Sequence, residues 1–292
     1  MGTRPVIVMT GATNGLGRLA AFDLARGGAH LVLIARSEQK ADTLRREIER
    51  VAPGTTVDVF LADLSLLGDV HRVGRRIDAH CPRIDVLINN AGLHAFSQRV
   101  TSEGFAEMTA VNYLAPWLLT DVLRDKLTAS TPARIVTVAS RASLHAGDLS
   151  PLRDLTDTAD YTRRESGPLY GRTKLMDIMF TQELGRRLEG TGVAVTCCCP
   201  GFNVTGLGRE LPFSGALEKV LTTLHLGDPR RGAEIIVRLA TDPAFAGITG
   251  GYFAAKNAQP LPYPQAGRDE TAQRTLWNVT AELLLPYVAR KP

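Results

Sequence analysis

The sequence lacks the features that mark membrane-spanning, secreted and nucleic-acid-binding proteins. No apolar run approaches the roughly 20 residues that cross a bilayer, and the N-terminus lacks the long apolar core of a secretion signal. The formal net charge of +4 is small for 292 residues, and the Lys and Arg side chains are scattered rather than clustered. We therefore expect a cytoplasmic protein that has no stable membrane insertion and no nucleic-acid partner.

Cysteine is scarce and its spacing is wrong for a metal site. The chain has four cysteines, of which three are consecutive at Cys197–Cys199. Adjacent cysteines do not give Cys-x-x-Cys spacing, and no pair of histidines completes a ligand set. We expect no metal, and interpret these residues as small apolar side chains in a buried strand.

Linkers, low-complexity tracts and solenoid repeats are also absent, which favours a single domain over residues 1–292. Short apolar runs instead alternate with longer amphipathic stretches almost from end to end. This alternation predicts an α/β fold, a Rossmann-type doubly wound three-layer sandwich with a seven-stranded parallel sheet. The expected strands are Pro5–Met9, Leu31–Ile34, Val57–Phe60, Val86–Asn89, Arg134–Ala139, Val193–Cys198 and Tyr252–Ala254. The expected helices are Gly15–Arg26, Glu38–Val51, Leu67–His80, Phe105–Leu127, Leu169–Leu188 and Pro229–Leu239.

Two long segments interrupt this alternation, each after the carboxyl end of a strand, where ligands bind in open parallel sheets. Arg141–Pro168 is polar, whereas 202–226 is irregular but rich in apolar side chains, Phe202 and Leu207 among them. We interpret 202–226 as a lid over a bulky, largely hydrophobic substrate. A contact between subunits could use the same apolar residues.

A glycine-rich loop directly follows the first strand and opens the first helix. Gly11, Gly15 and Gly17 let the backbone turn tightly and approach a pyrophosphate, whose charge then faces the helix N-terminus. The strand–loop–helix context favours dinucleotide binding over a plain turn.

An arginine follows the second strand at the position where an acidic residue would bind the ribose 2′-hydroxyl of NAD. Arg36 instead suits the 2′-phosphate of NADP, and Arg18 can approach the same region. We therefore expect NADP(H) to be favoured over NAD(H). The alternative is that both arginines are ordinary solvated surface residues.

Tyr170 and Lys174 are four residues apart in a predicted helix, so both side chains lie on one face. A phenol is a poor acid near neutral pH, with an ordinary pKa of about 10. A nearby ammonium favours the phenolate and makes proton transfer feasible.

The motifs and their order resemble the short-chain dehydrogenase/reductase family over about residues 5–255. The family patterns match the glycine loop at 10–17, Asn-Asn-Ala-Gly at 89–92, Tyr-x-x-x-Lys at 170–174 and Pro-Gly at 200–201. The resemblance implies cofactor contacts, besides Arg18 and Arg36, at Gly11, Thr13, Asn14, Gly15, Leu16, Gly17, Asp63, Leu64, Asn89, Ala91, Gly92, Tyr170, Lys174, Pro200, Gly201, Asn203 and Thr205.

The same resemblance implies a catalytic tetrad of Asn112, Ser140, Tyr170 and Lys174. Ser140 would bond the carbonyl oxygen, Tyr170 would deliver the proton, and Lys174 would also hold the nicotinamide ribose. Asn112 would anchor a water that connects Lys174 to solvent, unless its amide only satisfies backbone groups. The thirty positions between Ser140 and Tyr170 are more similar to the retinol dehydrogenase-like and protochlorophyllide reductase-like branch.

Three further polar residues are candidates for substrate contacts, together with Ser140 and Tyr170. His94 and His145 each follow a motif that ends at the expected cleft, and Arg141 could bind an acidic group. Lining or surface positions are commoner for such residues than a second acid–base role.

These inferences predict an NADP(H)-dependent ketoreductase that interconverts a ketone or aldehyde and an alcohol on a lipophilic small molecule. Reduction of a carbon–carbon double bond remains an alternative, because the same tetrad can protonate a carbanion. A non-enzymatic dinucleotide sensor is a second alternative, because fold alone does not fix function. A sugar-nucleotide epimerase is disfavoured by the glycine spacing. The protein is a possible homodimer or homotetramer.

Overall fold

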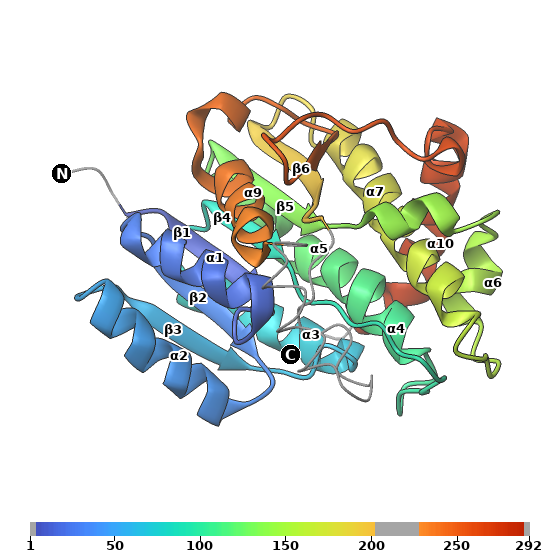
Figure 1. Cartoon of the computed structure of the whole chain (residues 1–292), viewed down its shortest axis with the longest axis horizontal. Helices are drawn as coiled ribbons and strands as arrows, with labels where there is room; N and C mark the ends of the chain where they lie inside the picture. Colours follow the sequence, from blue (N-terminus) through green and yellow to red (C-terminus); the bar gives the residue numbers. More distant parts are fainter. Residues whose placement is uncertain (1–3, 202–227, 289–292) are drawn as a thin grey trace.

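The computed structural model describes residues 4–201 and 228–288, which form one parallel sheet with helices on both faces (Figure 1). The sheet has seven strands in the order β3-β2-β1-β4-β5-β6-β7. This confirms the predicted α/β, Rossmann-type fold, while the single domain over 1–292 stays a prediction. The strands are β1 (Val6–Thr10), β2 (His30–Ala35), β3 (Val57–Leu61), β4 (Val86–Asn89), β5 (Ala133–Val138), β6 (Val193–Cys199) and β7 (Gly251–Ala254).

The helices pack their apolar sides onto the two faces of the sheet. One face is covered by α1 (Gly15–Arg26), α2 (Glu38–Val51) and α9 (Pro229–Thr241). The other is covered by α3 (Leu67–His80), α5 (Ala115–Ala129) and α7 (Ser166–Arg187). The central strands are buried on both sides, which explains why their sequences are continuous apolar runs.

Strand order reverses between β1 and β4, and in open α/β sheets ligands bind at the carboxyl edge beside such a reversal. The glycine loop follows β1, and the Asn-Asn-Ala-Gly motif continues from β4. The topology therefore brings both motifs to one edge.

The helix predicted at Phe105–Leu127 is interrupted. It consists of α4 (Glu107–Thr109), a π-helical turn (Ala110–Leu114) and α5. Apolar periodicity does not reveal a π-turn, because one extra residue shifts the register without removing the apolar face.

The segment Arg141–Pro168 is more ordered than predicted. It contains a 3₁₀ turn (Arg141–His145), the helix α6 (Pro151–Thr156) and the first residues of α7. These short elements could not be predicted because the segment is polar and has no apolar periodicity. The buried Asp154 stabilises them by pairing with Arg153 and Arg172.

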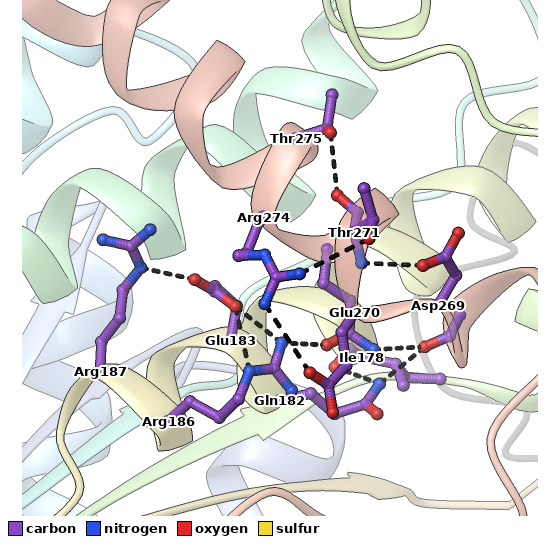
Figure 2. Close-up of polar contacts among 12 residues, drawn as sticks. Ile178, Gln182, Glu183, Arg186, Arg187, Asp269, Glu270, Thr271, Arg274 and Thr275 are labelled. Atoms are coloured by element: carbon purple, nitrogen blue, oxygen red, sulfur yellow. Dashed lines mark hydrogen bonds and ion pairs between the residues drawn. The ribbon is translucent and has the colours of Figure 1, made fainter.

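The C-terminal helix α10 (Glu270–Val288) lies outside α7, and Figure 2 shows the polar contacts at its start. Gln182 Nε2 donates to the carbonyl of Gly267 at 3.0 Å, and Gln273 Nε2 donates to the same oxygen at 2.8 Å. The indole of Trp277 stacks on Phe180 with ring centroids 5.8 Å apart. α10 thereby fixes the helix that carries Tyr170. None of the helices in the described ranges is both long and apolar enough to cross a membrane.

Candidate functional site

The glycine loop is shaped so that the backbone itself lines the site. A Cβ on Gly17 would lie 2.2 Å from the carbonyl oxygen of Gly11 and 2.5 Å from Nδ2 of Asn90, so no other residue fits there. Asn14 precedes α1 without a side-chain capping bond, and the first turn of α1 carries no acidic residue. Its N–H groups therefore fit a diphosphate, which supports the predicted dinucleotide site.

The remaining loop residues differ in what they offer to a cofactor. The Leu16 side chain is buried in the core beneath α1, so only its main chain can face a ligand. Thr13 is half-buried and Asn14 is exposed.

The two arginines predicted to bind phosphate differ in their exposure and in their partners. Arg36 is exposed immediately after β2. Arg18 is instead bound to Glu47 of α2, with Nη2 2.8 Å from Oε2, and its guanidinium lies over the ring of Phe22. Arg36 is thus the more available cation at this position.

The Asn-Asn-Ala-Gly motif ties the carboxyl ends of β1 and β4 together. Asn90 Nδ2 donates to the carbonyls of Thr10 and Gly11 at 3.0 and 3.1 Å. The Thr10 hydroxyl oxygen accepts from the main-chain N–H groups of Asn90 and Ala91, both at 3.0 Å. Asn90 and Thr10 were not predicted as site residues, although both belong to the quoted motifs.

Two predicted cofactor contacts already have protein partners. Asn89 points its amide into the core, where Nδ2 donates to Thr120 Oγ1 at 3.1 Å, so only its main chain can reach a cofactor. Asp63 Oδ1 accepts from both N–H and hydroxyl of Ser65 at 2.9 and 2.8 Å. Leu64 is half-buried and packs against the core.

Ser140 and Tyr170 are brought together by the packing of the 3₁₀ turn on α7. A Cβ at Gly171 would lie 2.4 Å from the carbonyl oxygen of Ala142, so only glycine allows this approach. Ser140 Oγ accepts from Ala142 N–H at 3.1 Å, and the Ser140 hydroxyl lies close enough to Tyr170 to lower the pKa of the phenol. The catalytic pairing of these two residues stays a prediction.

Lys174 is deeply buried beneath this pair. Its Nζ donates to the Val138 carbonyl at 2.8 Å and to Asp177 Oδ2 at 2.9 Å, and it lies 6.0 Å from the centroid of the Tyr170 ring. A Cβ at Gly92 would lie 3.6 Å from Nζ, so the Asn-Asn-Ala-Gly loop borders the ammonium.

Burial and two neighbouring charges act on the acidity of Tyr170. Burial raises the pKa of the phenol, the Lys174 ammonium lowers it, and the Asp177 carboxylate raises it again. Burial alone lowers the pKa of Lys174, but Asp177 and Tyr170 outweigh that effect and raise it. Lys174 is consequently a cation across the neutral range.

Asn112 lies in the π-helical turn and faces the same motif. Its Oδ1 accepts from Leu93 N–H at 2.8 Å, and its Nδ2 donates to the Leu93 carbonyl and Thr173 Oγ1 at 2.9 and 3.0 Å. These bonds match the backbone-satisfying alternative. A water-anchoring role stays a prediction.

The predicted substrate residues are spread around this centre. His94 stacks on Tyr170, whereas Arg141 and His145 are exposed on the 3₁₀ turn. Pro200 and Gly201 directly follow β6. Phe202, Asn203, Thr205, Leu207 and the proposed lid at 202–226 lie outside the described residues.

One charged residue of the site was missed. Asp177 is fully buried beside Lys174, and the spacing Lys-x-x-Asp on one helix face was a signal that could have identified it. The three consecutive cysteines are buried in β6, as predicted for small apolar residues of a strand. In the described ranges, no group of three or more His, Cys, Asp or Glu side chains could hold a metal ion.

Comparison with known proteins places this geometry in a family. The family model for short chain dehydrogenases matches residues 5–151. Human retinol dehydrogenase 14 is 36% identical over 290 residues, which cover 94% of this chain and 84% of that protein. A protein of Streptomyces sp. (strain C5), provisionally named daunorubicin C-13 ketoreductase DnrU, is 34% identical over 94% of this chain and 91% of its own length.

Solved structures agree with these relatives. A blue fluorescent protein from a metagenomic library, in complex with NADPH, has a TM-score of 0.67 at 25% identity, covering 87% of this chain and 97% of that one. A Beutenbergia cavernae protein with bound NADP, provisionally described as an NAD(P)-dependent gluconate 5-dehydrogenase, has a TM-score of 0.67 at 27% identity, covering 86% and 94%. These similarities make the chain an oxidoreductase of CH–OH and C=O groups. It belongs to the short-chain dehydrogenase/reductase family, in its retinol dehydrogenase-like branch.

Proposed function

We propose that this protein is an NADP(H)-dependent ketoreductase that interconverts a bulky, largely hydrophobic ketone or aldehyde with its alcohol. The observation that carries the proposal is the convergence of Ser140, Tyr170 and Lys174 beside the Asn-Asn-Ala-Gly motif, which is itself bonded to the glycine loop through Asn90. A protein that only senses a dinucleotide would need the glycine loop but not these three side chains together.

The cofactor preference rests on charge. A nicotinamide dinucleotide, when bound, supplies the hydride for the carbonyl carbon. The glycine loop and the N-terminus of α1 would hold its diphosphate. Arg36 is exposed where a 2′-phosphate would lie, and a guanidinium binds phosphate in a charge-assisted, often bidentate manner.

The protein side of the reaction follows from the hydrogen bonds. Ser140 Oγ accepts from Ala142 N–H, which leaves its own hydroxyl proton as a donor for the carbonyl oxygen. Tyr170 then donates its phenolic proton to the same oxygen, and the Lys174 ammonium stabilises the phenolate left behind. In oxidation the phenolate takes the alcohol proton.

Two observations support a lipophilic substrate. The segment 202–226 is rich in apolar side chains. The relatives include proteins named for retinol and for ketone reduction at C-13 of daunorubicin. The cytoplasmic location and the possible homodimer or homotetramer stay predictions.

A substrate panel tests the proposal. NADPH consumption would be followed with a polycyclic aromatic ketone, a steroid ketone, retinaldehyde and, as the matched small substrate, cyclohexanone, with Tyr170→Phe as the control enzyme. We expect the large carbonyls to react with the higher kcat/KM and to yield alcohols. Binding of NADPH without turnover of any carbonyl would favour a sensor, and a saturated product would favour double-bond reduction.

A further inference from the structure

Asp177 is a buried charge in contact with the centre of the site. Its side chain is 1% exposed, and Oδ2 accepts from Lys174 Nζ at 2.9 Å. Its other oxygen, Oδ1, is buried and has no hydrogen-bond partner in the described part of the chain. A half-satisfied buried carboxylate is costly, so this position does not serve stability alone.

The ammonium of Lys174 has three N–H donors. Two of them are already used within the protein, by Asp177 Oδ2 and the Val138 carbonyl. One donor is left for a ligand. Asp177 therefore limits both the position of the Lys174 nitrogen and the direction in which it can bind.

The charge of Asp177 also acts on Tyr170. Burial raises the pKa of the Asp177 carboxyl to about 6 against the opposing effect of Lys174, so the group is ionised above that pH. Asp177 follows Tyr170 by seven positions in α7, a rise of roughly 10 Å along the helix axis, which we take as the scale of the distance between the two groups. At an effective dielectric constant of about 20, one charge at that distance moves a pKa by about one unit.

Several other ionisable groups lie around the pair. Burial raises the pKa of the Cys197 and Cys198 thiols of β6, and that of Tyr113 in the π-turn, so these three are uncharged near neutral pH. The Cys199 thiol of β6 and the His94 imidazole also lie near the Tyr170 phenol. Asp177 is thus the anion that acts on both Lys174 and Tyr170 among the described residues.

We propose that Asp177 is a positioning residue, whose carboxylate holds the Lys174 ammonium at the floor of the site and weakens its pull on the Tyr170 phenol. The consequence is that Tyr170 remains a protonated acid to higher pH than Lys174 alone would allow. The catalytic role of Asp177 rests on the proposed function, whereas its electrostatic effect on Tyr170 can be measured without any turnover.

The test is an ultraviolet titration of tyrosinate. The signal of Tyr170 is the difference between the titration of a protein and that of the same protein carrying Tyr170→Phe. This difference is measured once for the unmodified chain and once for Asp177→Asn. We expect the midpoint of Tyr170 to fall by about one pH unit in Asp177→Asn. Asp154→Asn is the matched control, because it removes another buried carboxylate that pairs with α7, at Arg172. Its midpoint should not move.

A kinetic profile provides the second measurement. In alcohol oxidation, which needs the phenolate, the rising limb of kcat/KM with pH should move to lower pH by the same amount in Asp177→Asn. If the titration shifts but no carbonyl or alcohol reacts, the proposed function fails and the coupling stands. A Tyr170 midpoint that does not fall, including no ionisation in either protein before unfolding, overturns the coupling. Should Asp177→Asn not fold, Asp177→Ser replaces it, and loss of folding in both assigns Asp177 a structural role instead.

Discussion

The imidazole of His94 lies flat against the phenol of Tyr170, with ring centroids 4.8 Å apart and planes inclined by 15°. His94 Nε2 is 3.1 Å from Ser166 Oγ, whose hydroxyl donates to the Arg163 carbonyl at 2.8 Å. Since Ser166 uses its proton elsewhere, Nε2 of His94 is the donor in this pair. The first residue of α7 thereby fixes a ring that covers the proposed proton donor.

This stacking predicts that His94 acts through the shape of its ring. His94→Ala should lower kcat/KM by about 2- to 10-fold, as expected for the loss of an aromatic pair. His94→Phe keeps a flat ring and should stay near the unmodified value. Steady-state kinetics with one lipophilic ketone would check both variants. If His94→Phe is as impaired as His94→Ala, the imidazole takes part in the chemistry instead.

Removal of the Tyr170 hydroxyl tests the proposed acid directly. Tyr170→Phe should lower kcat by at least ~10²-fold, the lower range for a positioned acid–base group. The Kd for NADPH, measured by fluorescence titration, should be little changed because the phenol is not needed to hold the diphosphate. Near-normal turnover would refute the role assigned to Tyr170.

Arg36 should determine which dinucleotide is preferred. Arg36→Asp removes the cation that would meet the 2′-phosphate and introduces repulsion, so the KM for NADPH should rise far more than that for NADH. Arg50→Asp is a suitable control, because it makes the same charge change at the far end of α2, on an exposed residue. Equal changes in both Michaelis constants would contradict the predicted NADP(H) preference.

The strands could be predicted to within one residue at each end because most of them are apolar runs between polar segments, as at β4 (Val86–Asn89). The motif residues could be predicted because their chemistry is carried by local spacing. Two kinds of feature were missed. The π-turn around Asn112 leaves the apolar periodicity of the helix almost unchanged, and the order in 141–168 comes from tertiary contacts such as those of Asp154.

The hydrogen-bond and ion-pair partners of individual side chains also depend on residues that are distant in the sequence. Arg18 fits a phosphate by sequence, yet Glu47, which is 29 positions away, already binds it. Asn89 belongs to a cofactor motif, yet Thr120 on α5 holds its amide in the core. Sequence spacing finds which residues share an edge of the sheet, whereas the partners of each side chain follow only from packing.

The neighbour of Tyr170 gives the sharpest test of how the site is held together. A Cβ at Gly171 would lie 2.4 Å from the Ala142 carbonyl oxygen, and this backbone atom cannot move without displacing the turn that follows Ser140. Gly171→Ala should therefore lower the free energy of unfolding by about 1–3 kcal/mol, the usual cost of overpacking. It should also lower kcat, because Ser140 moves away from Tyr170.

Gly167→Ala is the matched control for that substitution. Gly167 lies in the same helix, α7, and a Cβ there would meet no heavy atom within 4 Å outside its two chain neighbours. Because Pro168 follows and disfavours a helical conformation of a preceding residue with a Cβ, Gly167→Ala should lower the Tm less than Gly171→Ala does, and it should leave kcat unchanged. Thermal unfolding and steady-state kinetics of the two variants side by side would check both expectations. Equal effects of the two substitutions would mean that the close approach of the 3₁₀ turn to α7 does not hold Ser140 and Tyr170 together.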